Sequence, residues 1–159
     1  MKGTFPIDKF RELRTPFYYY DTKVLRDTLS CIRTEALRYD NYSVHYAVKA
    51  NANPKVLTII RESGLGADCV SGGEIRAAIK AGFPADKIVF AGVGKADWEI
   101  NLGLDYNIFC FNVESIPELE IINELAFTLI FVYFHERYDY MTFQNGKSKK
   151  RDAFFSIPA

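Results

Sequence analysis

The hydrophobic pattern of the chain repeats a short apolar run followed by a longer segment with apolar residues at helical spacing. Short runs that predict β-strands begin near residues 43, 67, 87 and 106. Each run is followed by helix-capping residues and an apolar stripe. Strands that alternate with helices at this interval predict parallel βα units. The expected fold class is therefore α/β, with about four βα units.

A strand and a helix are expected before these units. The aromatic run Phe17–Tyr20 predicts a strand, because aromatic residues favour extended structure. Asp21 then serves as a helix N-cap. Leu25, Leu29 and Ile32 follow at i, i+3 and i+4 spacing, which predicts an amphipathic helix directly before the first unit.

The first βα unit, residues 43–54, carries the most informative pattern. Its apolar positions alternate with small or polar ones, the second set being His45, Ala47 and Lys49. Asn53–Pro54 then predicts a helix start. Lys49 is thus expected at the strand end, where parallel α/β proteins bind ligands. Its amine is either a solvated ammonium, the commoner case by spacing alone, or a nucleophile for a carbonyl group.

Two further segments have the spacing of a capping box. Ser71–Glu74 and Ser115–Glu118 each place a serine three residues before a glutamate at a predicted helix start. The first is mainly a structural motif, although its two glycines also permit close approach of an anion. Gly92–Gly94 does not extend to a dinucleotide fingerprint, because position 97 is an aspartate. Lys95 is interpreted as a lysine at the rim rather than a catalyst.

Composition narrows the function classes. With 159 residues, the chain is expected to form one domain, and its 20 basic and 20 acidic residues indicate neither nucleic-acid nor membrane binding. No signal peptide or membrane span is expected. The three cysteines lack the CxxC spacing of a zinc site, so no metal is expected. Unpaired cysteines are typical of a cytoplasmic protein.

Tyr46–Asn51 and Asp68–Glu74, at this separation, closely resemble motifs of the diaminopimelate decarboxylases. These are pyridoxal-phosphate-dependent decarboxylases with an alanine-racemase-like barrel. The resemblance covers Thr15 to about Ala126. It implies that Lys49 binds pyridoxal 5′-phosphate covalently and that Asp68 and Glu74 lie beside the cofactor. It also implies that Thr15–Asp21 matches a strand of a second, β-rich domain.

The activity implied by this resemblance is decarboxylation of meso-2,6-diaminopimelate to L-lysine. The substrate would be a small amino acid, and the full-length family is expected to form homodimers. Two alternatives stay open: a related basic amino-acid decarboxylase, and a module that binds pyridoxal phosphate without catalysis. The later half of the family supplies the phosphate loop and the substrate-binding side chains. No segment of this chain matches them.

Length indicates how much of the barrel the chain can form. A complete (β/α)8 barrel needs about 200 residues or more, so a chain of this length is expected to form a partial TIM-type barrel of about four units. Residues 1–126 are expected to be its N-terminal part. Residues 127–159 are interpreted as a divergent tail, with a possible fifth strand at Leu129–Phe134 and a flexible end. An isolated chain of this kind is expected to have impaired activity.

Overall fold

The computed structural model describes residues 3, 5–39 and 42–133, with side chains up to residue 126. The helices and strands follow in the order α1 (Ile7–Phe10), α2 (Thr22–Ala36), β1 (His45–Ala47), the 3₁₀ helix η1 (Val48–Ala50), α3 (Pro54–Glu62), β2 (Gly66–Cys69), α4 (Gly72–Lys80), the 3₁₀ helix η2 (Ala85–Lys87), β3 (Ile88–Phe90), α5 (Asp97–Asp105), β4 (Cys110–Phe111) and α6 (Ile116–Tyr133).

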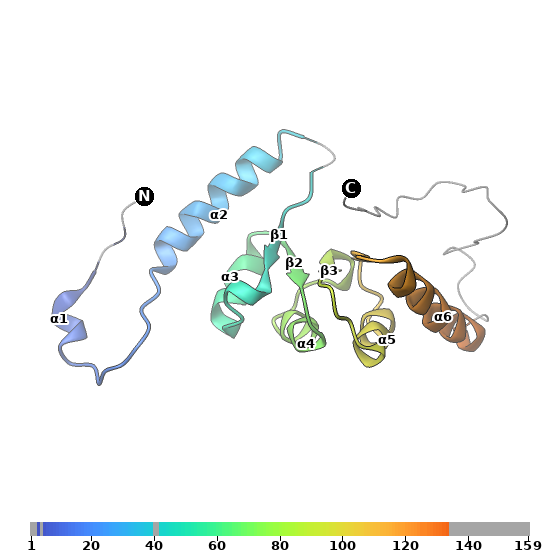
Figure 1. Ribbon diagram of the computed structural model, residues 1–159. Coiled ribbons are helices and arrows are strands. Elements are labelled where there is room, and N and C mark those ends of the chain that lie inside the picture. Colours follow the sequence, from blue (N-terminus) through green and yellow to red (C-terminus); the bar gives the residue numbers. More distant parts are fainter. Residues whose placement is uncertain (1–2, 4, 40–41, 134–159) are drawn as a thin grey trace.

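The four strands form one parallel sheet in the order β1-β2-β3-β4. Helices α3, α4 and α5 lie together on one side of this sheet (Figure 1). Each connects a strand to the next, as the alternating pattern of the sequence predicted. The fold class is therefore confirmed: the chain is α/β and forms part of a TIM-type barrel.

The two faces of the sheet differ in burial. The face toward the helices contributes fully buried side chains to one core with α3 and α4, among them Val48, Leu57, Ile60, Cys69, Ile75, Ile88 and Phe90. The opposite face carries one row across all four strands, in which Ala47, Asp68, Val89 and Cys110 are register partners. Of this row, only Val89 is buried. The partly exposed face is the one that lines the interior in a closed barrel.

The helix starts follow from local sequence. The Asp21 carboxylate accepts hydrogen bonds from the backbone N–H groups of Lys23 and Val24, and α2 begins at the next residue. The Asn53 side chain accepts from the N–H of Lys55, with proline at the first position of α3. These caps satisfy backbone donors that have no partner within the helix. The predicted helices after Asp21 and Asn53 are confirmed.

The strand predicted at Phe17–Tyr20 is not formed. These residues belong to no strand or helix, and the part of the chain described before residue 45 contributes no strand to the sheet. Aromatic composition favours extended backbone, but a β-strand also needs a neighbouring strand to satisfy its N–H and C=O groups. Within the described residues, the sheet offers none to this segment.

The possible fifth strand at Leu129–Phe134 is also wrong over residues 129–133, which continue α6. Phe134 lies outside the described residues. A short apolar run cannot be distinguished from a buried helix by periodicity alone. The helix that begins at Ile116 meets no glycine after its start and no proline after its first turn, so the pattern gives no reason for it to stop.

Candidate functional site

Lys49 lies at the carboxyl end of β1, in the single turn of η1. Its side chain is exposed, and its ammonium has no hydrogen-bond or ion-pair partner within the described residues. The sequence predicted this lysine at the junction of strand and helix, and the structure has it there, although β1 ends at Ala47. An unpaired amine at the carboxyl end of a parallel sheet can reach a bound ligand.

The residues around Lys49 hold its turn in place. Val48 is fully buried in the core, although its neighbour Lys49 is exposed. The Tyr46 hydroxyl donates a 3.2 Å hydrogen bond to the carbonyl of Asn51. Burial raises the pKa of Tyr46, and this hydrogen bond partly opposes the rise. The exposed amine is therefore attached to an anchored segment of backbone.

Asp68 lies on β2, beside β1, and is the register partner of Ala47. Its Oδ1 atom is buried and has no hydrogen-bond partner within the described structure. A buried carboxylate oxygen without a partner is costly, and such atoms mark places where a ligand or water completes the site. Asp68 and Lys49 thus lie at the ends of neighbouring strands, each with an unpaired polar atom.

Glu74 has a structural role that differs from the expected capping box. Ser71 Oγ accepts from the Glu74 N–H at 3.3 Å, as the motif predicts. The Glu74 carboxylate, however, accepts from the N–H of Val70 at 2.9 Å instead of the N–H of Ser71. The second box repeats this geometry, because Glu118 accepts from the N–H of Glu114. Both glutamates therefore fix the loop before the helix.

Glu99 has a role that was not predicted from the sequence. Its Oε1 accepts a 2.7 Å hydrogen bond from the Gly72 N–H at the start of α4, and its Oε2 accepts from Ala96. Trp98 packs against Gly72 so closely that a Cβ there would lie 2.7 Å from the indole ring. The two glycines were expected to permit the approach of an anion, but the Gly72 N–H already donates to the carboxylate of Glu99. No local signal could reveal this contact, since 27 residues separate the two groups.

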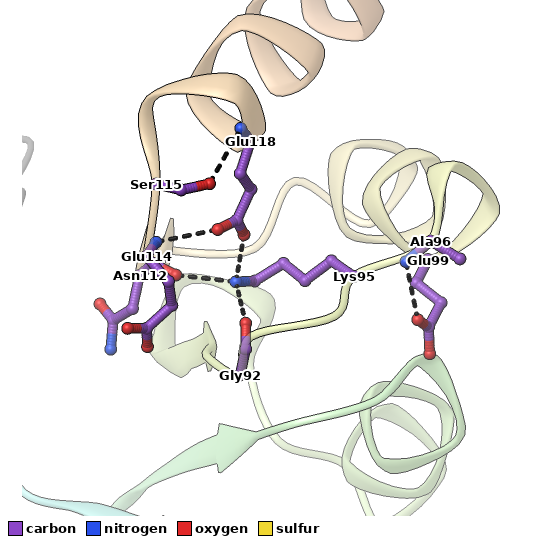
Figure 2. A network of polar contacts seen from close by, with 8 residues as sticks. All are labelled: Gly92, Lys95, Ala96, Glu99, Asn112, Glu114, Ser115 and Glu118. Carbon is purple, nitrogen blue, oxygen red and sulfur yellow. Dashed lines mark hydrogen bonds and ion pairs between the residues drawn. The ribbon is translucent and has the colours of Figure 1, made fainter.

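Lys95 joins the two neighbouring loops at this end of the sheet (Figure 2). Its ammonium donates to the carbonyls of Gly92 and Asn112 at 2.7 and 2.8 Å and to the carboxylate of Glu118. The Lys95 side chain is only 1% exposed and also lies 5.4 Å from the centre of the Phe90 ring. All three donors are therefore used, which agrees with a non-catalytic lysine at the rim, and the side chain is buried between the two loops.

Two further groups have altered acidity. Burial lowers the pKa of His45, with an added effect from Lys87, while the charge of Asp68 opposes it. Burial also raises the pKa of the Cys69 thiol to about 12, and the charges of Glu74 and Asp68 add to the rise. His45 stacks on Phe109 with ring centres 6.4 Å apart. These environments favour a neutral imidazole and an unreactive thiol.

The donor set fits a carbonyl cofactor better than a metal. Within the described residues, no group of three or more histidine, cysteine, aspartate or glutamate side chains could hold a metal ion. An unpaired amine can bond to an aldehyde carbon, and an unpaired carboxylate oxygen can bind a polar atom of the same molecule. The part of the chain that the structure describes also contains no helix of sufficient length and apolar character to cross a membrane.

Comparison with known families identifies the domain. Residues 27–136 match the family model described as "Pyridoxal-dependent decarboxylase, pyridoxal binding domain". This match extends ten residues beyond the predicted boundary at Ala126, and the division into residues 1–126 and 127–159 stays a prediction.

Curated relatives support the same assignment. The diaminopimelate decarboxylase of Bacteroides thetaiotaomicron is 86% identical over 126 residues, which are 79% of this chain and 33% of the relative. The diaminopimelate decarboxylase of Aquifex aeolicus is 43% identical over 112 residues, 70% of this chain and 26% of the relative. The chain thus spans about a third or less of the length of these relatives.

Solved structures of similar proteins share this fold. Diaminopimelate decarboxylase from Helicobacter pylori, solved with L-lysine, aligns with a TM-score of 0.70 and 40% identity over 77% of this chain and 31% of that chain. Lysine/ornithine decarboxylase from Vibrio vulnificus, solved with putrescine, aligns with a TM-score of 0.53 and 28% identity over 62% of this chain and 28% of that chain. Family model, relatives and fold agree, and the chain belongs to the pyridoxal-dependent decarboxylases through their pyridoxal-binding domain.

Proposed function

We propose that this chain supplies the cofactor-binding part of a meso-diaminopimelate decarboxylase, with Lys49 as the residue that binds pyridoxal phosphate covalently. The observation that supports this most directly is the unpaired amine of Lys49, exposed on an anchored turn at the carboxyl end of β1. The 86% identity to a diaminopimelate decarboxylase favours this substrate. The arginine and lysine/ornithine decarboxylases among the similar structures are only 26% and 28% identical.

In this proposal Asp68 contacts the cofactor directly and Glu74 acts indirectly. The unpaired Oδ1 of Asp68 is available to a polar atom of the ligand. The Glu74 carboxylate is already engaged by the Val70 N–H, so it positions the loop after β2. Pyridoxal phosphate, when bound, supplies a ring that accepts the electron pair left by departing carbon dioxide. Lys49 Nζ is the group of this chain that can return a proton to that substrate carbon.

Activity of the isolated chain is expected to be low. The row that contains Ala47, Asp68 and Cys110 lies on the partly exposed face of the sheet. An open site leaves water in contact with the reacting groups, whereas these reactions depend on exclusion of water and on exact placement of the substrate. We also propose that the complete enzyme forms a homodimer and works in the cytoplasm; the three free cysteines support a reducing location.

A chimera tests the proposed function. The segment of the Bacteroides thetaiotaomicron relative that aligns with this chain is replaced by the 126 aligned residues from this chain. We expect carbon dioxide release from meso-diaminopimelate, lost by at least about a thousandfold in Lys49→Ala. Lys55→Ala is the matched control, because Lys55 is exposed in the first turn of α3.

Other outcomes of this experiment select the alternatives. The later half of the chimera comes from the relative and supplies the substrate-binding side chains, so its turnover of meso-diaminopimelate tests the cofactor-binding role of this chain and not its substrate choice. A folded chimera that binds pyridoxal phosphate at Lys49 without any turnover would indicate a module that binds the cofactor only. A folded chimera that is equally active with and without Lys49 would refute the proposed role of this residue.

A further inference from the structure

The turn that carries Lys49 is short. Helix η1 spans only Val48–Ala50, and the N–H of Asn51 closes it with a 3.1 Å hydrogen bond to the carbonyl of Val48. Such 3₁₀ turns have poorer hydrogen-bond geometry than α-helices and are weak on their own. An amine reacts well only when it is held close to the reacting atom. The placement of the Lys49 amine therefore depends on contacts that hold this turn from outside.

Tyr46 supplies a contact of this kind. Its hydroxyl donates a 3.2 Å hydrogen bond to the carbonyl of Asn51. Tyr46 precedes Lys49 and Asn51 follows it, so this bond bridges the turn. The Tyr46 ring is half-buried and packs against the core. Burial raises the pKa of Tyr46, so the hydroxyl stays protonated at neutral pH and remains a donor.

The side chain of Tyr46 lies on the face of the sheet toward the helices. Its register partner on β2 is Ala67, which is fully buried in the core. Successive side chains of a strand alternate between faces, so Ala47 and its partner Asp68 lie on the opposite face. A ligand that contacts Asp68 is thus separated from Tyr46 by the sheet. Tyr46 can act on such a ligand only through the turn that carries Lys49.

The bridge from Tyr46 continues into helix α3. The Asn51 side-chain oxygen accepts a 2.9 Å hydrogen bond from the N–H of Asn53. The Asn53 side chain in turn accepts from the N–H of Lys55 in the first turn of α3. In this series, the Tyr46 hydroxyl is the group that comes from before Lys49. Its removal should therefore release the turn while the cap of α3 stays in place.

We propose that Tyr46 is a positioning residue of the pyridoxal phosphate site, because its hydroxyl fixes the turn that presents Lys49 to the aldehyde of the cofactor. Without this hydroxyl the turn is ordered only when the ligand binds, and the entropic cost of that ordering weakens binding. The inference rests on the proposed function for the identity of the ligand. The hydrogen bond across the turn does not depend on it.

Tyr46→Phe tests this inference, because it removes the hydroxyl and keeps the ring. The full chain is treated with pyridoxal phosphate at low concentration, reduced with borohydride and digested, and the ratio of modified Lys49 to modified Lys55 is measured by mass spectrometry. Lys55 is exposed on the same molecule and serves as an internal reference. We expect this ratio to fall about three- to tenfold in Tyr46→Phe, in line with the loss of one hydrogen bond.

Two control variants separate positioning from general stability. Tyr42→Phe removes the hydroxyl of a tyrosine that is 70% exposed, with no hydrogen bond from it recorded within the described residues. Ile100→Val shortens a buried side chain of α5 and lowers stability at a distance from the turn. Both variants should keep the labelling ratio of the unsubstituted chain. An equal fall in Ile100→Val and Tyr46→Phe would overturn the positioning role.

Hydrogen exchange in the absence of cofactor gives a second readout. The N–H of Asn51 should exchange at least about threefold faster in Tyr46→Phe, because the bond that closes the turn opens more often. The N–H of Ile75, bonded to the Ser71 carbonyl at the start of α4, should exchange at an unchanged rate. Faster exchange at Asn51 together with a lower labelling ratio would support the inference. Unchanged exchange at Asn51, or an unchanged ratio, would overturn it.

Failure of the proposed function would be visible in a different sample. If the unsubstituted chain showed no preferential labelling of Lys49, the proposed role of Lys49 would be refuted, and the positioning role of Tyr46 with it. If the unsubstituted chain labelled Lys49 preferentially and Tyr46→Phe did so equally, only the role of Tyr46 would be refuted.

Discussion

Lys95 and Glu118 form a buried ion pair between the loop after β3 and the first turn of α6, and their side chains are 1% and 12% exposed. The pair joins segments that lie 23 residues apart in the chain. Glu118 also accepts the N–H of Glu114, so one carboxylate orders both the lysine and its own loop. This part of the rim is therefore held by side chains from two consecutive βα units (Figure 2).

Removal of Lys95 should strongly destabilise the chain. Lys95→Met leaves the largely buried Glu118 carboxylate without its cation, which typically costs about 3–5 kcal/mol. The measurement is the free energy of unfolding in urea. Lys87→Met is the control, because the exposed ammonium of Lys87 donates one 3.2 Å bond to the Gly64 carbonyl, and its loss should cost less than about 1 kcal/mol. Similar losses for the two variants would argue against a stabilising role of the Lys95–Glu118 ion pair.

The two adjacent glycines of α4 should respond differently to alanine. In Gly72→Ala the new Cβ meets the Trp98 ring, so the ring must move and the protein should lose about 1 kcal/mol. Gly73→Ala meets only Ser71 Oγ at 3.7 Å and should be neutral or stabilising by about 0.4–1 kcal/mol. Trp98 is the one tryptophan of the sequence. Its fluorescence should therefore change in the first variant alone, and a change in both would contradict the contact.

Contacts between residues close in sequence were predicted, whereas contacts between distant residues were not. The caps at Asn53 and Ser71 lie within three residues of the groups they satisfy, and the sequence predicted both helix starts. The contact of Glu99 with Gly72 spans 27 residues and depends on how two helices pack, so no local pattern contains it. Lys49 was found because its neighbours form a recognisable motif. The buried state of Lys95 was not found, since a lysine after a strand is usually solvated.

The two incorrect strand predictions have a common physical cause. Phe17–Tyr20 and residues 129–133 have the apolar or aromatic composition of strands. Strand formation depends on a neighbouring strand and not on the segment alone, whereas a helix satisfies its own backbone. The first segment has no strand partner in the described structure, and the second continues a helix already started at Ile116.

The lowered pKa of His45 predicts a loss of stability at mildly acidic pH. Its pKa is lowered by burial, so the unfolded chain binds a proton at a pH where the folded chain does not. The contribution of neutral His45 to the free energy of unfolding is therefore fully present above the ordinary pKa of about 6.5. It decreases as the pH falls below that value, toward the lowered pKa of the folded chain. His45→Phe should remove this part of the decrease while retaining a ring against Phe109. An unchanged profile for His45→Phe would contradict the assignment.

The cysteines should differ in reactivity. At pH 7 a thiol with a pKa of about 12 is ionised in about one molecule in 100,000, and Cys69 is also fully buried. Cys31 is exposed on α2. Iodoacetamide followed by peptide mass mapping should thus label Cys31 in the folded chain and Cys69 only after denaturation. Early labelling of Cys69 would show that its strand is not packed as described.

We propose Lys49 as the residue that binds pyridoxal phosphate. Its most direct test is reduction with borohydride after addition of pyridoxal phosphate at low concentration, with peptide mapping of the modified lysines. We expect Lys49 to be labelled in preference to exposed Lys55, and Asp68→Asn to lower labelling of Lys49 while Lys55 is unaffected. Equal labelling of Lys49 and Lys55 at every concentration would contradict it.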